Sequence, residues 1–340
     1  GRKMSKSLGN SPDPLELIEK YGADGVRVGM LLSSPAGNDL LFDESYCEQG
    51  RNFANKMWNA FRLIKNWQPD ASIHQSGTGK IATAWIKSKL NEQLALINDK
   101  MRISEVLMIK YKLFWDDFCA WYLEMIKPAY GSVAIDTETY NSTIAVFENL
   151  LRILHPFMPF ITEELWHELK NRGGRDCIIV STWPKQTSPD NVLLQGMSHV
   201  QNIISTLRTF RNEKGISPKT ALQLLTTEKH QSTFDDIILK LANVSSIEKT
   251  NNFNKAFSFM AGTHEYAIPF DQNIDTAAER IRIEKEIAYN KGFLDTVMKK
   301  LGNVNFVSKA KPEVIASEEK KKSDAEQKIK SLEQQLNMMR

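Results

Sequence analysis

The sequence predicts a mainly α protein, built from a helical bundle, a small α/β subdomain and a C-terminal antiparallel coiled-coil hairpin. Apolar residues recur every three or four positions from residue 44 to about residue 169, which is the period of packed helices. From residue 191 to about residue 270, strand-like apolar runs alternate with helical stretches. From residue 283 onward, apolar positions alternate by four and three, with one break between Gly302 and Pro312, as in two helices that pair.

The composition is that of a folded protein without membrane helices. The 340 residues are 41% hydrophobic, which provides apolar surface for two or three domains. Uninterrupted apolar runs stay well below the roughly 18 to 20 residues of a membrane helix, and the N-terminus lacks the apolar run of a signal peptide. We therefore expect a soluble, cytoplasmic protein. Its net charge of +3 arises from Asp275 onward, where 14 Lys and Arg face 11 Asp and Glu.

The cysteines indicate neither disulfides nor a metal. Cys47, Cys119 and Cys177 stand far apart, without a CxxC pair, and their number is odd. We expect three reduced, mostly buried thiols and no metal site.

Residues 1–45 are expected to form a first segment with two short helices. Asp13 is a helix-capping residue, Pro14 suits the first helical position, and Glu16 stands three positions after the cap. These signals predict a helix from Pro14 to Tyr21 that ends at Gly22, followed by a second apolar segment from Val26 to Leu32.

Residues 46–190 are expected to form the helical bundle, with four or five helices. Its middle carries an aromatic group whose spacing favours a buried helical stripe over a base-stacking platform. The members of this group are Phe114, Trp115, Phe118, Trp121 and Tyr122.

Residues 191–272 are expected to form the small α/β subdomain. Helical stretches are predicted at 200–211 and 234–241, and strands at 221–225, 256–260 and 266–270. Arg208 and Arg211 lie at one helix end, where a structural contact and an RNA contact are equally compatible with the sequence.

Residues 273–340 are expected to form the two-helix arm. The first helix presents apolar residues from Ile283 to Leu301, and the second repeats the rhythm from Ala325 to Leu336. Because two short halves flank one turn, we expect an antiparallel hairpin in a monomer, with a dimerising coiled coil as the alternative. Glu318 and Lys322 fall in the seam, which predicts weak packing near the turn.

The sharpest chemical signal is the Lys3-Met4-Ser5-Lys6-Ser7 loop. Two lysines three positions apart in a short polar loop can place two ammonium groups on one polyphosphate. Charge that develops between phosphates in a transition state would be neutralised there, which is a general form of electrostatic catalysis.

The surroundings of this loop resemble the signature loop of class I aminoacyl-tRNA synthetases. The loop is followed by Asn10, by the helix start at Asp13 and by Tyr21-Gly22-Ala23-Asp24. The segments 56–62, 117–127 and 154–166 look like the helical anticodon-binding domain that valyl-, isoleucyl- and leucyl-tRNA synthetases share.

The segment 37–44 and the arm, with 292–294 and 306–310, look most like the valyl family. A bacterial isoleucyl enzyme of the common type would end in a Cys-rich zinc module, which the scattered cysteines do not build. An isoleucyl or leucyl enzyme, and a free-standing tRNA-binding module without a catalytic role, remain the alternatives.

The resemblance implies a role for the loop in a longer enzyme that joins valine to tRNA(Val) with ATP and Mg²⁺. Lys3 and Lys6 would be catalytic and would bind ATP, with Ser5 and Ser7 supporting them. The family's other signature, a His-x-Gly-His element, is missing, because the nearest pair of histidines, His155 and His167, is twelve residues apart. We therefore expect a C-terminal portion that does not aminoacylate by itself.

The resemblance also suggests two tRNA-contacting surfaces, although a solvated helix face explains the same charges. RNA bases in loops are read by stacking and by hydrogen bonds to their edges, so polar and aromatic residues of one helix are candidates for the anticodon. These are Arg51, Asn55, Lys56, Trp58, Asn59 and Arg62. On the arm, lysines near the turn are candidates for phosphate contact. These are Lys299, Lys300, Lys309 and Lys311.

Overall fold

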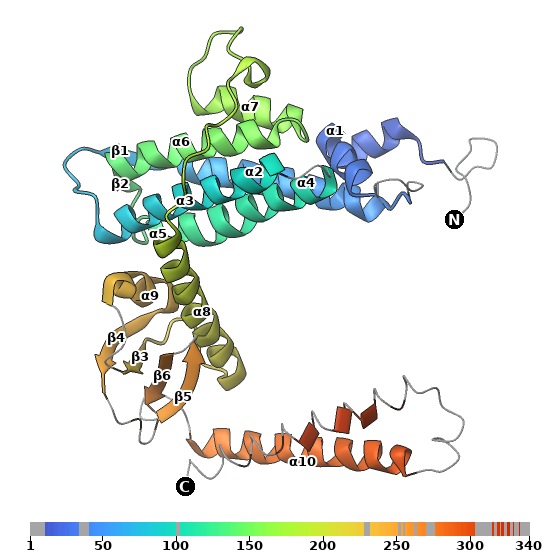
Figure 1. The fold of residues 1–340 in the computed structure, drawn as a ribbon, viewed down its shortest axis with the longest axis vertical. Coiled ribbons are helices and arrows are strands. Elements are labelled where there is room, and N and C mark those ends of the chain that lie inside the picture. The colour runs from blue at the N-terminus through green and yellow to red at the C-terminus, as the bar shows by residue number, and fades with distance from the viewer. Residues whose placement is uncertain are drawn as a thin grey trace. The chain divides into compact units, whose positions relative to one another are not determined.

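The computed structural model divides the chain into two compact units, residues 1–200 and 201–340. It describes residues 11–33, 41–99, 103–227, 232–250, 253, 256–261, 264–269 and 276–302, together with isolated helical positions between 315 and 333. The described part is mainly helical, as the sequence predicts (Figure 1).

Unit 1 opens with a kinked helix, α1 (Pro14–Leu32). The Asp13 carboxylate accepts a hydrogen bond from the Leu15 amide, and Pro14 occupies the first turn, so the predicted helix start is confirmed. At Gly22 the backbone leaves helical geometry with φ 75°, a conformation that glycine adopts without steric cost. The predicted end of the first helix is therefore correct, but the second helix resumes at once instead of at Val26.

α1 packs against α2 (Glu44–Lys65) at unusually short range. A Cβ atom on Gly29 would lie 2.4 Å from Sγ of Cys47 and 2.7 Å from its backbone nitrogen. A Cβ atom on Gly50 would lie 2.8 Å from the carbonyl oxygen of Gly25. Glycines on both helices thus allow the two backbones to approach closely. Leu17, on the first half of α1, is buried in the same core.

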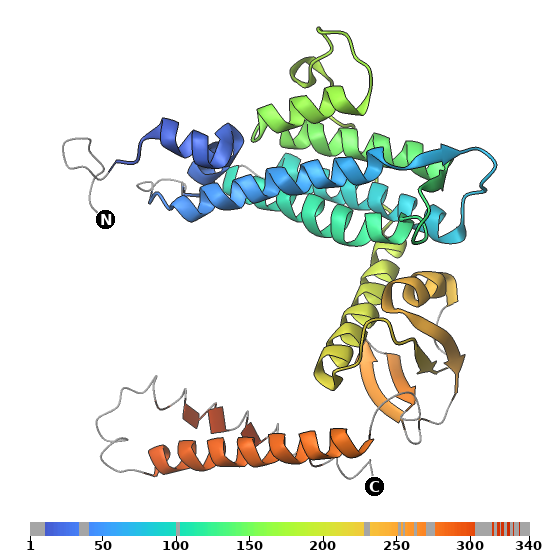
Figure 2. The ribbon, with the colours of Figure 1, turned by 180° about the vertical axis from the view of Figure 1, so that it is seen from behind.

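The rest of unit 1 is the helical bundle (Figures 1 and 2). Its α3 packs against α6 and η2, and its α7 packs against α2 and α6. Two short strands, β1 and β2, pair in parallel. The elements are β1 (Gln68–Asp70), α3 (Gly77–Asp99), α4 (Ile103–Lys112), the π-helix η2 (Leu113–Tyr122), α5 (Leu123–Ile126), β2 (Ala134–Asp136), α6 (Thr137–Leu154), α7 (Pro159–Leu169) and the 3₁₀ turn η3 (Ile178–Val180).

Aromatic side chains of η2 form the centre of the bundle. Phe114, Phe118 and Tyr122 are fully buried, and Phe118 stacks on Phe147 of α6 with ring centroids 5.7 Å apart. The predicted buried stripe is therefore confirmed for these residues. Trp115 and Trp121, in contrast, remain partly exposed.

Unit 2 contains a four-stranded sheet in the order β4-β3-β6-β5. β3 and β4 are parallel and are connected through α9, whereas the remaining pairs are antiparallel. α8 (Asn191–Lys214) begins in unit 1 and continues into unit 2. The further elements of the sheet region are β3 (Leu222–Thr226), the 3₁₀ turn η4 (Ser232–Phe234), α9 (Asp235–Ala242), β4 (Val244–Lys249), β5 (Ala256–Ala261) and β6 (His264–Pro269). The sequence predicts three of these strands and misses β4, an edge strand of mostly polar residues.

Arg211 holds α8 to the loops of this unit. Its guanidinium donates to the carbonyl oxygens of Ser217, Thr220, Ala242 and Asn243 at 2.7 to 3.1 Å, and burial lowers its pKa. Of the two interpretations that the sequence left open for Arg211, these bonds favour the structural contact.

α10 (Thr276–Leu301) is the described helix of the arm. Lys291 pairs with Glu333 at 2.7 Å, and Lys300 pairs with Glu318 at 3.9 Å. From Lys291 to Lys300 the residue number along α10 rises, whereas the residue number of the partner falls from Glu333 to Glu318. This order is expected of antiparallel helices. Glu318 is only 6% exposed, in keeping with its predicted seam position. The hairpin itself stays a prediction, because most of residues 303–340 lie outside the described residues.

Candidate functional site

The loop from Lys3 to Ser7, with Ser5 and Lys6, lies outside the described residues, but the helix that follows it is well anchored. The Asp24 carboxylate of α1 accepts hydrogen bonds from the amides of Phe160 (3.3 Å) and Ile161 (2.7 Å) in the first turn of α7. It therefore caps a helix distant in sequence, and burial raises its pKa.

A second residue of α1 strengthens this attachment. Arg27 donates from Nη2 to the carbonyl of Pro156 (3.3 Å) and from Nε to that of Phe157 (3.4 Å). The neighbouring His155 bonds through Nδ1 to the Thr162 hydroxyl at 2.8 Å, and burial lowers the pKa of the imidazole. The bonds of Asp24 and Arg27 thus fasten α1 to the bundle.

A hollow of about 700 Å³ lies where the chain enters α1 and α2. Backbone and side chains from both helix starts line it: Ser11, Pro12, Leu41, Phe42, Asp43, Glu44 and Tyr46. Ser11 is the first of these lining residues in the sequence, and it follows Ser7 of the lysine loop by four positions.

The predicted anticodon-contacting residues all lie on α2, but they do not share one face. Asn55, Asn59 and Arg62 are exposed and follow each other by four and three positions, so they form one polar stripe. Trp58 is partly buried, with its ring 5.6 Å from that of Phe61. The stripe is the most accessible part of the predicted set.

Arg51 is turned toward α1. Its guanidinium donates to the carbonyl of Lys20 at 3.4 Å, pairs with Glu48 at 3.5 Å and lies 5.6 Å from the ring centroid of Tyr21. These contacts make Arg51 part of the packing between α1 and α2. Less of its guanidinium group is therefore accessible to a ligand.

Lys56 is turned toward η2, where it borders a groove that the sequence did not reveal. Its Nζ lies 5.1 Å from the ring centroid of Trp115, and Trp115 stacks on Tyr111 at 5.3 Å with 13° between the planes. The groove has a volume of about 360 Å³. It is lined by Ser45, Tyr46, Glu48, Gln49, Asn52, Tyr111 and Trp115.

The chemistry of this groove suits an unpaired nucleobase. Its two stacked aromatic side chains are partly exposed, and the amides of Gln49 and Asn52 both donate and accept hydrogen bonds. The lysine at its border supplies a positive charge for phosphate. The only sequence signal was Trp115 itself, because Tyr111 and α2 meet it through tertiary packing.

Of the predicted phosphate-contacting lysines of the arm, the structure describes Lys299 and Lys300, and both are exposed and paired. Lys299 pairs with Asp295 at 2.7 Å, and this hydrogen bond raises its pKa. Lys300 pairs with Glu318 across the arm. Lys309 and Lys311 lie outside the described residues. The Lys299–Asp295 pair is exposed on both sides and therefore weak in water, so the Lys299 ammonium group can exchange its partner for a phosphate. The Glu318 partner of Lys300 is nearly buried.

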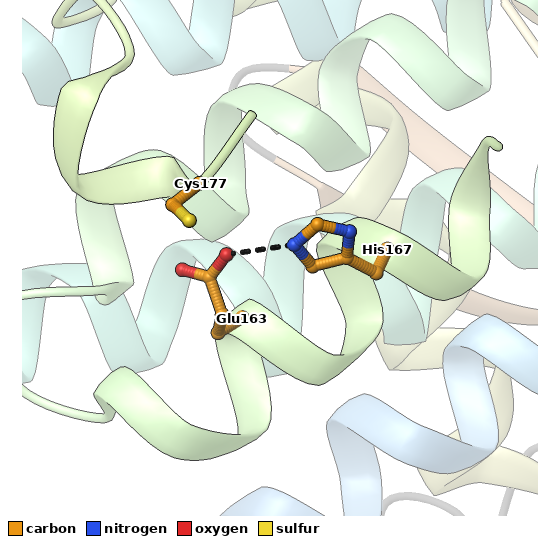
Figure 3. Close-up of side chains that lie close together, drawn as sticks. All are labelled: Glu163, His167 and Cys177. Atoms are coloured by element: carbon orange, nitrogen blue, oxygen red, sulfur yellow. Dashed lines mark hydrogen bonds and ion pairs between the residues drawn. The ribbon is translucent and has the colours of Figure 1, made fainter. Parts of the chain in front are cut away.

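The thiols agree in part with the expectation from sequence. Cys47 and Cys119 are free and buried, and burial raises the pKa of Cys119 to about 12. Cys177 is free and partly exposed, and it lies close to Glu163 and His167 (Figure 3). The expectation of no metal site rested on the lack of a CxxC pair. That criterion does not detect a group of one glutamate, one histidine and one cysteine.

Within the part of the chain that the structure describes, every helix is too short or too polar to cross a membrane.

Three family models match separate parts of the chain. Residues 1–43 match tRNA synthetases class I (I, L, M and V), residues 83–226 match the anticodon-binding domain of tRNA ligase, and residues 275–340 match the valyl tRNA synthetase tRNA binding arm. With its lysine loop, helical bundle and arm, the chain belongs to the class I aminoacyl-tRNA synthetases.

Curated relatives specify the member of this class. Valine–tRNA ligases of Parabacteroides distasonis, Phocaeicola vulgatus and Oceanobacillus iheyensis are 50%, 51% and 36% identical over 99%, 99% and 97% of this chain. Within the class, the chain therefore belongs to the valine–tRNA ligase family. It spans 39%, 39% and 40% of the length of these relatives.

Proposed function

We propose that the chain is the tRNA-binding region of a cytoplasmic, monomeric valine–tRNA ligase, which attaches valine to tRNA(Val) with ATP through valyl-adenylate. The observation that carries this proposal is the similarity to valine–tRNA ligases at about half identity along 99% of the chain. The match of residues 275–340 to a valyl-specific arm favours this enzyme over its isoleucyl and leucyl counterparts.

In this proposal, Lys3 and Lys6 act on the phosphates of ATP. Two ammonium groups, which only donate hydrogen bonds, and the hydroxyls of Ser5 and Ser7, which can donate, suit an anionic group rich in oxygen. The set therefore fits a polyphosphate. Carboxylates are missing from this loop, so Mg²⁺ would be held by the phosphates and by other parts of the enzyme. ATP supplies the adenylyl group, and the two lysines stabilise the negative charge on the departing pyrophosphate.

The α2 surface would contact the anticodon region of the tRNA. The stripe of Asn55, Asn59 and Arg62 offers hydrogen bonds to base edges and phosphates, and the groove beside Lys56 offers a stacking surface on Trp115. On the arm, the lysines would contact the phosphate backbone, which positions the tRNA without reading its sequence.

Exchange of pyrophosphate into ATP tests the catalytic part of the proposal. In a ligase chain that contains this segment, Lys6→Ala is expected to raise the barrier of valine-dependent exchange by about 2 to 4 kcal/mol, the scale of one lost transition-state donor. The control Lys80→Ala, an exposed lysine at the start of α3, should leave the exchange rate unchanged. The 340-residue chain alone should show no exchange.

Two results would contradict the proposal. Exchange that isoleucine or leucine stimulates in place of valine would identify one of the related ligases. Exchange that is equal in the Lys6→Ala and parent enzymes would leave the loop without a catalytic role, as in a free-standing tRNA-binding module.

A further inference from the structure

Three side chains of types that bind zinc converge beside α7 (Figure 3). Glu163 and His167 lie one turn apart on this helix, and Cys177 immediately precedes η3. One carboxylate oxygen, one imidazole nitrogen and the thiol sulfur all lie within 4.8 Å of one another. We propose that these three residues form a binding site for a divalent cation of the zinc type, separate from the ATP loop and the α2 surface.

The Glu163 and His167 atoms are already at the spacing of two metal ligands. Nε2 of His167 lies 3.1 Å from Oε1 of Glu163. Two ligand atoms that are each about 2.1 Å from a tetrahedral zinc lie about 3.4 Å apart. A small opening of this pair therefore admits the ion. The same pair without metal is an ordinary contact between residues four apart on a helix, so the thiol is what makes the cluster a metal site.

Cys177 is held near this pair by bonds that do not involve its own side chain. The amide of Ile178 donates to Oε2 of Glu163 at 3.2 Å, and Nε1 of Trp166 donates to the carbonyl of Asp176 at 2.9 Å. The backbone is thus fixed on both sides of the cysteine. Hydrogen bonds of this kind orient ligands before the metal arrives, which lowers the entropic cost of binding.

The donor set selects the kind of cation. Mg²⁺ and Ca²⁺ prefer oxygen ligands, whereas Zn²⁺ and Co²⁺ accept imidazole nitrogen, thiolate sulfur and carboxylate oxygen together. All three side chains are partly exposed, so an ion can enter from solvent. Three protein ligands leave one position of a tetrahedron for water.

A metal here would secure the loop that joins α7 to η3. Arg172 in this loop is nearly buried and contacts the carboxylates of Glu148 and Asp176. The ion would add a link between α7 and the far end of the same loop. Its effect would therefore fall on the stability of this corner of the bundle.

Metal titration of the full 340-residue chain tests the proposal. The reduced protein is freed of metal by chelator and dialysis and is then titrated with ZnCl₂ or CoCl₂. We expect one equivalent of Zn²⁺ to bind, and Co²⁺ to give the near-ultraviolet absorption band of a thiolate–cobalt bond. Cys177→Ser should abolish this band, and His167→Gln and Glu163→Gln should each weaken binding by about tenfold or more.

Matched variants separate this site from general metal binding. Glu164→Gln changes the exposed neighbour of Glu163, and His74→Gln changes an exposed histidine outside the cluster. Both should bind Zn²⁺ as the parent chain does. A parent chain that binds no Zn²⁺, or a cobalt band that persists in Cys177→Ser, would overturn the proposal.

Alkylation of the unaltered protein gives an answer even if a ligand variant fails to fold. Cys177 is the partly exposed cysteine, whereas Cys47 and Cys119 are buried. Zn²⁺ should slow the modification of Cys177 by iodoacetamide about tenfold or more, because a metal-bound thiolate is a poorer nucleophile. Equal rates with and without Zn²⁺ would refute the site.

Discussion

Substituting Gly29 tests the close packing that joins the lysine-loop segment to the bundle. A methyl group at this position would meet Sγ, the nitrogen and Cα of Cys47 at 2.4, 2.7 and 2.9 Å. Two of these atoms belong to the backbone of α2, so a side-chain rotation does not relieve the overlap. The helices must separate by roughly 1 Å to restore ordinary contacts, and overpacking of this kind costs about 1 to 3 kcal/mol. We expect Gly29→Ala to lower the stability of unit 1 by that amount.

Urea denaturation followed by tryptophan fluorescence measures this change in one unit. All seven tryptophans of the chain lie in unit 1: Trp58, Trp67, Trp85, Trp115, Trp121, Trp166 and Trp183. The fluorescence transition therefore reports unit 1 even if unit 2 unfolds separately.

Two further variants sharpen the interpretation. Gly77→Ala is the control, since a Cβ at Gly77 has no neighbour within 4 Å. Adding Cys47→Ala to Gly29→Ala removes the sulfur contact but leaves the two backbone contacts, so it should restore only part of the lost stability. If Gly29→Ala and Gly77→Ala differ by less than about 0.5 kcal/mol, the reasoning about this helix crossing is wrong.

Two other predictions concern buried charges of unit 1, with the same fluorescence assay. Burial lowers the pKa of Lys110 to about 7, so the folded state releases its proton before the unfolded state does, and stability should rise as the pH rises from about 7 toward 10.5. The Lys110 ammonium lies 4.1 Å from the ring centroid of Phe157 and 5.4 Å from that of Trp183. Lys110→Met should remove the slope and add about 1 to 3 kcal/mol at pH 6; this is less than about 1.4 kcal/mol per pKa unit would give, because the ring contacts are lost. A slope that persists, or one that the exposed Lys112→Met also removes, would contradict this. Asp24→Ala should cost about 1 to 2 kcal/mol by removing the cap of α7, and Asp24→Asn should cost less because it keeps an acceptor; equal stability of both variants and the parent would show that the cap contributes nothing.

The bundle and the subdomain could be predicted because their signals are local. The three- and four-residue period of the apolar positions identified the bundle helices, and Asp13 and Gly22 marked the start and end of the first helix in α1. Caps, glycine turns and periodicity act within a few residues, so a sequence displays them directly. The edge strand β4 was not predicted, because its side chains are mostly polar and it is stabilised by pairing with β3.

The groove and the metal-type cluster could not be predicted because they depend on contacts between distant residues. Trp115 meets α2 across some sixty positions of sequence, and no local pattern indicates which residues of α2 it faces. Likewise, the spacing of Glu163 and His167 was visible, but the approach of Cys177 depends on a loop held by Trp166. The close approach at Gly29 is of the same kind, since only the facing backbone explains why a side chain is excluded there.

The salt dependence of tRNA binding tests the central claim most directly. We expect the 340-residue chain to bind a tRNA(Val) transcript with an affinity that falls steeply as KCl rises, because phosphate contacts release counterions. The variant tested replaces the four predicted phosphate-contacting lysines of the arm with glutamine: Lys299, Lys300, Lys309 and Lys311. It should bind more weakly, with a salt slope lower by about 0.7 to 0.9 for each lost contact, and its preference for tRNA(Val) over an anticodon-altered transcript should be unchanged. A chain that does not bind tRNA(Val), or a variant whose affinity and salt slope equal those of the parent, would contradict the account.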